Sequence, residues 1–263
     1  MMRSIIKSNR AKKLGAGLAV ACFWLMVWQL AYWHVGKEIL IVSPFHAARR
    51  LTELALGLPF WRSVGATCLR VIIGFLAALV AGGVLAGLTA RFLPLYILFS
   101  PLLNVIKSTP VASFIILALI WIKSGGVPVF IAFLMVVPMV WTNLYAGLRH
   151  ADPELLEMAR VFQFSPWKKL RFIYIPALMP YFTAACSTGL GFAWKSAVAA
   201  EVIAHPENSI GLRIYNAKIY LETTDLFAWT IGIVLISVML ERIALLLLAR
   251  LERRLLGGIG GRD

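Results

Sequence analysis

The sequence predicts an all-α membrane protein, a single domain over residues 1–263 with about six spanning helices. Sixty per cent of the residues are hydrophobic and the mean hydropathy is +0.83, which is too apolar for a water-soluble domain of this length. Several apolar runs approach or exceed the roughly twenty residues that cross a bilayer. The net charge of +14 could suggest a nucleic-acid partner. Because the basic residues gather at the ends of the apolar runs, the lipid bilayer is the expected partner instead.

The first helix is expected over residues 14–33, after a basic segment. Residues 1–13 carry basic side chains and no acidic one, which predicts a cytoplasmic N-terminus. The apolar run is too long for the core of a signal peptide, and no small-residue cleavage site precedes His34. Residues 37–62 are mixed in polarity, and we predict an amphipathic helix on the outer surface between Pro44 and Pro59.

Three further spans are expected in the first half of the chain. They cover residues 66–88, 95–122 and 127–148. The first contains Gly83 and Gly87 at a spacing that lets another helix approach closely. The second should be interrupted by Pro101 and Pro110, because an interior proline removes a hydrogen bond and clashes with the preceding turn.

A charged segment, residues 152–175, follows the fourth span. It contains two helix starts, Asp152-Pro153 and Ser165-Pro166, each with a capping side chain before a proline at the first helical position. The first helix is amphipathic, with its charged side chains three residues apart on one face. A helix this short is marginal alone in water, so we expect another protein to bind this cytoplasmic segment.

The last third of the chain is expected to hold two spans and an outer loop. The fifth span covers residues 181–203, and its many small residues suit a helix packed on all sides. Residues 205–225 are polar and should form an outer loop with a short helix at 210–220. The sixth span begins near residue 226 and leads into a basic tail, residues 249–263, so both termini are expected in the cytoplasm.

No catalytic or metal site is predicted. The sequence lacks a Gly-x4-Gly-Lys-Ser/Thr loop, so the chain is not expected to bind ATP phosphates in the usual way. The four histidines lie apart near span ends, without metal-ligand spacing. Each of the three cysteines sits in an apolar run, where a small buried side chain is the simplest interpretation.

Ionisable residues inside the spans are the candidate functional positions, because charge in a bilayer is costly. Lys195, beside Trp194, either lines a solute path that favours an anion or reaches a backbone carbonyl or the membrane surface. Lys107 is a second candidate, since a broken helix near Pro110 is tolerated where it lines a cavity or is buried in protein. Glu201 does not share a helical face with Lys195, and we expect it to lie at the membrane interface and hold the outer loop.

Residues 157–176 also match a known motif. Glu157-Met158-Ala159, then Gln163 and Ile173-Tyr174-Ile175-Pro176, resembles the E-A-A-x3-G-x9-I-x-L-P signature of permeases of ATP-binding-cassette (ABC) importers. Residues 69–75, 194–201 and 210–212, followed by Thr224-Asp225, look like the nitrate/sulfonate/taurine/bicarbonate branch of that family. The chain departs from the signature at Gln163, where glycine would suit a left-handed turn at the helix end.

The resemblance implies a MetI-like permease fold and a transport role in the bacterial inner membrane. It implies a homodimer, two cytoplasmic ATPase subunits that bind the ATP and magnesium, and an external binding protein that delivers a small, anionic solute. Together with the charged residues inside the spans, it predicts three groups of site residues: a coupling helix with Glu154, Glu157, Met158, Ala159, Arg160 and Gln163; a possible pathway with Lys107, Pro110, Trp194 and Lys195; and a structural group or outer gate with Glu201 and Gly211.

Two other classes of protein remain open from the residues alone. An ion-gradient-driven transporter or channel would need no ATPase and no capped docking helix, and it would more often show an inverted repeat with paired broken helices. A membrane-embedded enzyme would need clustered catalytic groups within its spans, which the sequence lacks.

Overall fold

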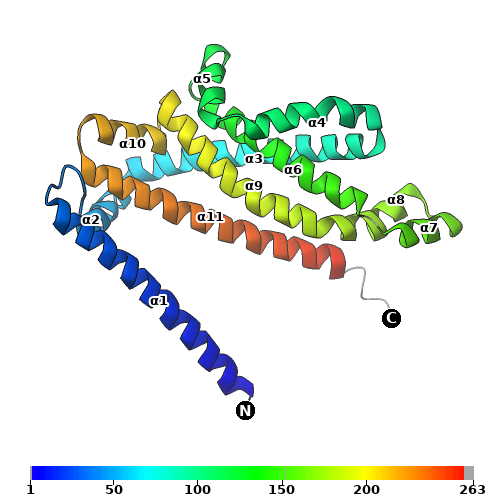
Figure 1. Ribbon diagram of the computed structural model, residues 1–263, viewed down its shortest axis with the longest axis horizontal. Helices are drawn as coiled ribbons and strands as arrows, with labels where there is room; N and C mark the ends of the chain where they lie inside the picture. The colour runs from blue at the N-terminus through cyan, green and yellow to red at the C-terminus, as the bar shows by residue number, and fades with distance from the viewer. Residues whose placement is uncertain (1, 151, 258–263) are drawn as a thin grey trace. The chain divides into compact units, whose positions relative to one another are not determined.

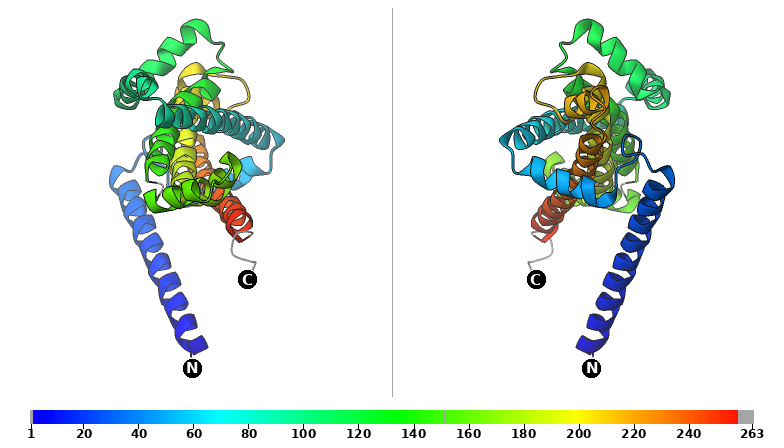
Figure 2. Two further views of the ribbon diagram at one scale, coloured as in Figure 1. Left: turned by 90° about the vertical axis from the view of Figure 1, so that its right-hand side faces the viewer. Right: turned by 90° about the vertical axis from the view of Figure 1, so that its left-hand side faces the viewer.

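The computed structural model describes residues 2–150 and 152–257, and within these ranges it contains helices, turns and loops but no strand (Figures 1 and 2). The helices are α1 (Met2–Val35), α2 (Pro44–Ala55), α3 (Leu58–Arg91), α4 (Leu93–Ser108), α5 (Val111–Trp121), α6 (Val127–Arg149), α7 (Pro153–Val161), α8 (Pro166–Lys169), α9 (Ile175–Ala204), α10 (Ile210–Ile219) and α11 (Thr223–Gly257). A π-helical turn, Leu170–Tyr174, joins α8 to α9.

Three helices of the described residues are long and apolar enough to cross a membrane: α3, α6 and α11. The α4 and α5 helices pass the same test only as a pair, which is bent by 107° and makes a fourth broken span. A shorter apolar stretch, Ala19–Val35, lies in α1. The all-helical membrane class is therefore confirmed, whereas the count of six spans stays a prediction.

Several boundaries differ from those expected. The α4 helix continues through Pro101, so the span breaks only at Pro110. Prolines are tolerated inside spanning helices where neighbouring groups satisfy the freed carbonyl. The α9 helix begins at Ile175, directly after the π-helical turn and before the expected residue 181, with Pro176 in its first turn. The α11 helix extends through most of the expected tail, and residues 258–263 of that tail lie outside the described residues.

The chain divides into two compact units, which we describe separately. Unit 1 comprises Met1–Phe60 and Arg213–Gly232, and unit 2 comprises Trp61–Leu212 and Ile233–Asp263. The α3, α10 and α11 helices pass from one unit to the other.

In unit 1, the predicted amphipathic helix forms as α2. Ser43 caps it by accepting a 3.2 Å hydrogen bond from the His46 N–H, and Pro44 occupies the first turn. The indole of Trp28 in α1 donates to the Val42 carbonyl and stacks on Phe227 of α11, with ring centroids 5.7 Å apart. These contacts hold α1, the loop before α2 and the start of α11 together.

In unit 2, α3, α6 and α9 form the core, and α6 and α9 run side by side (Figure 1). The α3 and α6 backbones meet closely at two glycines: a Cβ on Gly74 would lie 2.6 Å from the Val129 carbonyl oxygen, and one on Gly82 would lie 2.8 Å from Val140. At the predicted Gly83 and Gly87 spacing, a Cβ on Gly83 would lie 3.6 Å from Leu144 of α6, whereas one on Gly87 would meet nothing within 4 Å, so a contact between two copies at Gly87 stays a prediction.

Candidate functional site

The predicted docking segment begins at the two expected caps. Asp152 Oδ1 accepts a 2.9 Å hydrogen bond from the Glu154 N–H at the start of α7. Ser165 Oγ accepts one of 3.4 Å from the Lys168 N–H at the start of α8. Both side chains satisfy N–H groups that have no acceptor within the helix, so local chemistry fixes where each helix begins.

The turn after α7 is left-handed even though glutamine occupies the glycine position of the signature. Gln163 has a φ of 50°. The Phe164 N–H donates to the Ala159 carbonyl at 2.9 Å, and the Gln163 N–H donates to the Arg160 carbonyl at 3.1 Å. These two bonds form a Schellman motif, which closes the end of α7 with glutamine in a conformation that glycine adopts more easily.

The exposed surface of α7 is both charged and apolar. Glu154, Glu157, Arg160 and Gln163 are exposed. Apolar side chains lie beside them: Leu155, Met158, Val161 and Phe162, of which Val161 and Phe162 are 72% and 70% exposed.

The interpretation of Ala159 as a contact for a partner is wrong, because its side chain is fully buried within this chain. The exposed part of the motif therefore lies at Glu157 and Met158, while Ala159 packs on the inner side of α7. Leu155 and Phe162, whose helical spacing puts them on the same side as Ala159, are both exposed.

Lys107 lines a cavity of about 380 Å³ at the break between α4 and α5. Its walls come from four helices and the break itself: Ile106, Lys107, Thr109, Val111, Met135, Met139, Thr142, Asn143 and Phe192. Pro110 lies between two of these residues but does not itself line the cavity. The Lys107 ammonium donates to Thr142 Oγ1 and lies 5.8 Å from the centre of the Trp141 ring.

The other pathway candidates lie elsewhere on α9. Trp194 is buried, and its Nε1 has no hydrogen-bond partner among the described residues. Lys195 is exposed and does not line the Lys107 cavity. The structure therefore does not bring Lys107 and Lys195 into one site.

Glu201 is the centre of a buried polar cluster in unit 2. Its carboxylate accepts hydrogen bonds from Thr67 Oγ1 at 2.9 and 3.0 Å, from Arg70 Nη1 at 3.0 Å and from the Gly211 N–H at 3.2 Å. The side chain of Glu201 is completely buried within the chain, and its expected position at the membrane interface stays a prediction. Glu201 does fix the first turn of α10, and it faces away from exposed Lys195 as the helical spacing predicted.

Arg70 and Thr67 are the members of this cluster that sequence reasoning missed. Arg70 also donates to the carbonyl oxygen of Glu207 at 2.9 Å, so it links α3 to both α9 and the loop before α10. A signal was present, because Arg70 is an ionisable residue within an apolar span, like Lys195. Its partner lies 131 residues away and could not be inferred from spacing.

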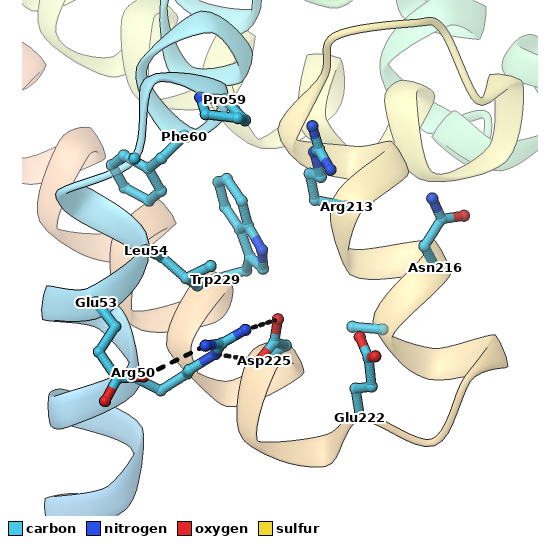
Figure 3. A pocket seen from close by; sticks show the side chains of 12 residues that line it. Arg50, Glu53, Leu54, Pro59, Phe60, Arg213, Asn216, Glu222, Asp225 and Trp229 are labelled. Atoms are coloured by element: carbon cyan, nitrogen blue, oxygen red, sulfur yellow. Dashed lines mark hydrogen bonds and ion pairs between the residues drawn. The ribbon is translucent and has the colours of Figure 1, made fainter.

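Unit 1 contains a separate polar pocket of about 320 Å³ (Figure 3). Arg50 of α2 donates to both carboxylate oxygens of Asp225, at 2.6 and 3.1 Å. These hydrogen bonds raise the pKa of the Arg50 guanidinium above its ordinary value. Phe60 and Trp229 stack beside this ion pair, with centroids 4.8 Å apart. The ion pair with Asp225 stabilises the charge of Arg50 within this unit.

The described residues contain no group of three or more histidine, cysteine, aspartate or glutamate side chains that could hold a metal ion. All three cysteines are free thiols. Cys186 is buried as expected, whereas Cys22 is exposed on α1.

Comparison with known protein families shows to which family the chain belongs. Residues 71–257 match the family described as the inner membrane component of binding-protein-dependent transport systems. The chain belongs to this family. It is a permease subunit of an ABC importer, a class of transport subunits in which ATP hydrolysis belongs to a separate protein.

Two permeases of bacterial transport systems are similar to most of this chain. The putative aliphatic sulfonates transport permease protein of Bacillus subtilis is 26% identical over 84% of this chain and 80% of its own length. The taurine transport system permease protein of Escherichia coli is 23% identical over 87% and 83%. A chain from the crystal structure of an amino acid ABC transporter with histidines superposes with a TM-score of 0.54 at 20% identity, covering 73% of this permease and 94% of that chain. That match establishes the ABC permease fold.

Proposed function

We propose that this permease acts as a single transmembrane domain in a homodimer in the bacterial inner membrane. Two copies enclose the solute path, two ATPase subunits bind ATP and magnesium on the cytoplasmic side, and an external binding protein delivers the solute. Both termini lie in the cytoplasm. The family and the likeness to other ABC permeases support this assembly.

The single observation that carries the proposal is the exposed surface of α7. The nine-residue helix ends at Val161, and both Val161 and the following Phe162 are largely exposed, which leaves apolar area in contact with water. Glu157 and Arg160 are exposed beside this apolar area, so a partner protein with complementary charges could bind here. We assign this surface to the ATPase subunit, because it occupies the loop that the signature marks as the coupling helix.

The solute is a small acid in this proposal. The permease of Bacillus subtilis named above is a putative aliphatic sulfonates transporter, and the Escherichia coli one is a taurine transporter. Lys107 supplies a positive charge within the broken span, which favours an anion. Motion of α7 would pass through the π-helical turn into α9 and so change access to the path.

Glu157→Lys tests the docking assignment. The change reverses a charge at the contact surface, so we expect the ATPase to dissociate or to stay bound without solute-stimulated ATP hydrolysis. Glu207→Lys is the matched control, since Glu207 is also exposed but lies at the opposite end of α9. Co-elution from a sizing column and solute-stimulated ATP hydrolysis are the measurements. Normal co-elution and coupling in Glu157→Lys would reject α7 as the docking helix.

Phe162→Ala is a second variant of the same surface. It removes an exposed ring without adding charge, so it should weaken ATPase binding while leaving the fold intact. A bulky residue at Ala159 would not be a clean test, because that side chain is buried and a larger one would disturb the permease itself.

The proposed orientation is tested by labelling single cysteines in a variant without the three native ones. An impermeant thiol reagent added to intact cells should react with Asn208→Cys and not with Ser165→Cys. Both positions are exposed in the structure, so a difference reports the side of the membrane. Reaction at Ser165→Cys from outside would overturn the orientation.

A further inference from the structure

The geometry points to the cavity beside Lys107 as a binding site for an organic acid, with its anionic group near the break between α4 and α5 and its apolar part against Met139 and Phe192. This inference rests on the proposed function, because it names the place on this permease where the transported acid is held.

The first support is that the Lys107 ammonium has free donors and, within the part of the chain that the structure describes, no carboxylate partner. An ammonium carries three N–H donors, and the structure uses one of them on Thr142 Oγ1. Among the described residues of unit 2, no carboxylate forms an ion pair with Lys107. The Thr142 hydroxyl proton is itself donated to the Pro138 carbonyl at 2.7 Å. The cavity therefore holds a cation with donors to spare and no counter-ion, which an anionic ligand would neutralise.

The second support is the backbone at the break. The α5 helix begins at Val111, which lines the cavity, and no side chain caps its N-terminus. The Ser113 N–H donates to the Pro110 carbonyl, so the N–H groups of Val111 and Ala112 precede the first local hydrogen bond. The start of a helix carries partial positive charge, and broken helices in transporters present such ends to anionic groups. Figures 1 and 2 show how sharply α5 turns away from α4 at this point.

The third support is the composition of the remaining wall. Met135, Met139 and Phe192 give it a largely apolar surface. Asn143 adds one amide, whose Nδ2 donates to the Met139 carbonyl at 2.8 Å and retains a second N–H. A volume of about 380 Å³ lies within the range of small-molecule sites, roughly 300 to 1,000 Å³. A fully hydrated inorganic anion would leave the apolar wall unused, whereas an alkyl or aryl sulfonate or carboxylate would contact both parts.

The test measures the charge preference of the cavity directly. In the full permease–ATPase complex without native permease cysteines, Met139→Cys places one thiol in the cavity wall. Its reaction rates with the sulfonate and the trimethylammonium forms of an ethyl methanethiosulfonate reagent are compared with those of a free thiol. One unit charge within several ångströms should favour the sulfonate reagent by about tenfold or more.

Three further variants identify the source of the preference. Adding Lys107→Met should return the rate ratio to that of the free thiol, whereas Lys107→Arg should retain it. Lys195→Met is the matched control and should leave the ratio unchanged, because Lys195 lies outside the cavity. Butane-1-sulfonate should protect the thiol from modification, and butan-1-ol at the same concentration should not.

Three outcomes would overturn the inference. One is a rate ratio that Lys107→Met leaves unchanged, and another is equal protection by the sulfonate and the alcohol. The third is a thiol that neither charged reagent reaches, which would mean that lipid or the second copy fills the cavity. Co-elution of the ATPase is recorded on the same preparations, so a failure of the proposed assembly is seen separately from the rate ratio.

Discussion

Replacing Arg70 by methionine should destabilise the permease far more than replacing an exposed arginine. The substitution keeps most of the side-chain length and removes the charge that faces Glu201. Glu201 is 0% exposed and Arg70 is 18% exposed, and their closest atoms are 3.0 Å apart. Methionine would leave the carboxylate buried with only Thr67 and the Gly211 N–H as donors.

The magnitude follows from that burial. Removing one partner of a buried ion pair costs about 3 to 5 kcal/mol in the free energy of unfolding, because an uncompensated charge remains. Loss of the Arg70 hydrogen bond to the Glu207 carbonyl adds about 1 kcal/mol. The reference pair is Arg49–Glu53 in α2, whose side chains are 70% and 45% exposed. An exposed pair of this kind contributes less than about 1 kcal/mol.

The assay is unfolding in mixed detergent micelles, followed by circular dichroism at rising dodecyl sulfate fraction. Arg70→Met should unfold at a clearly lower fraction than Arg49→Met. The double variant Arg70→Met/Glu201→Gln should recover part of the loss, because a neutral amide can be buried at lower cost than an unpaired carboxylate. Equal behaviour of the two arginine variants, or no recovery in the double variant, would refute the account of this cluster.

The remaining predictions concern backbone fit and the outer ion pair. Gly211→Ala should lower stability by about 1 to 3 kcal/mol in the same unfolding assay, since its Cβ would lie 2.4 Å from Glu201 Cβ. Gly191→Ala, whose Cβ would meet nothing within 4 Å, should be neutral or stabilising, and equal losses at both glycines would contradict the packing. Gln163→Gly should remove the backbone strain of the left-handed conformation, stabilise the folded state by up to about 1 kcal/mol and slow hydrogen exchange in α7. Faster exchange in the variant would show that Gln163 is not strained. Asp225→Asn removes the charge that Arg50 binds and should speed hydrogen exchange in α2, and unchanged exchange would show that this pair does not hold the helix.

The features that sequence predicted correctly depend on neighbouring residues. Asp152 and Ser165 each cap a helix that starts at the next residue, a proline, so the beginnings of α7 and α8 could be inferred from four residues. The break at Pro110 also has a local cause, although the same rule for interior prolines wrongly predicted a break at Pro101.

The features that sequence missed depend on residues far apart in the chain. Arg70 and Glu201 meet only because α3 and α9 pack in one unit, and no local pattern encodes that contact. Thr142 and Asn143 enter the Lys107 cavity because α6 passes beside the broken span. Helical spacing groups Ala159 with Leu155 and Phe162, but only Ala159 is buried, because periodicity shows which residues share a side of a helix and not which of them are covered.

The buried cluster at Glu201 also sets a mechanical constraint on α9. This helix has 30 residues and is therefore about 45 Å long. If it behaves as a stiff rod, a tilt of about 5° at the end joined to α8 displaces the other end by about 4 Å. The hydrogen bond from the Gly211 N–H cannot stretch that far, and the two backbones already touch at Gly211. The first turn of α10 must therefore travel with α9, so a small rotation at the start of α9 becomes a shift of several ångströms at its other end.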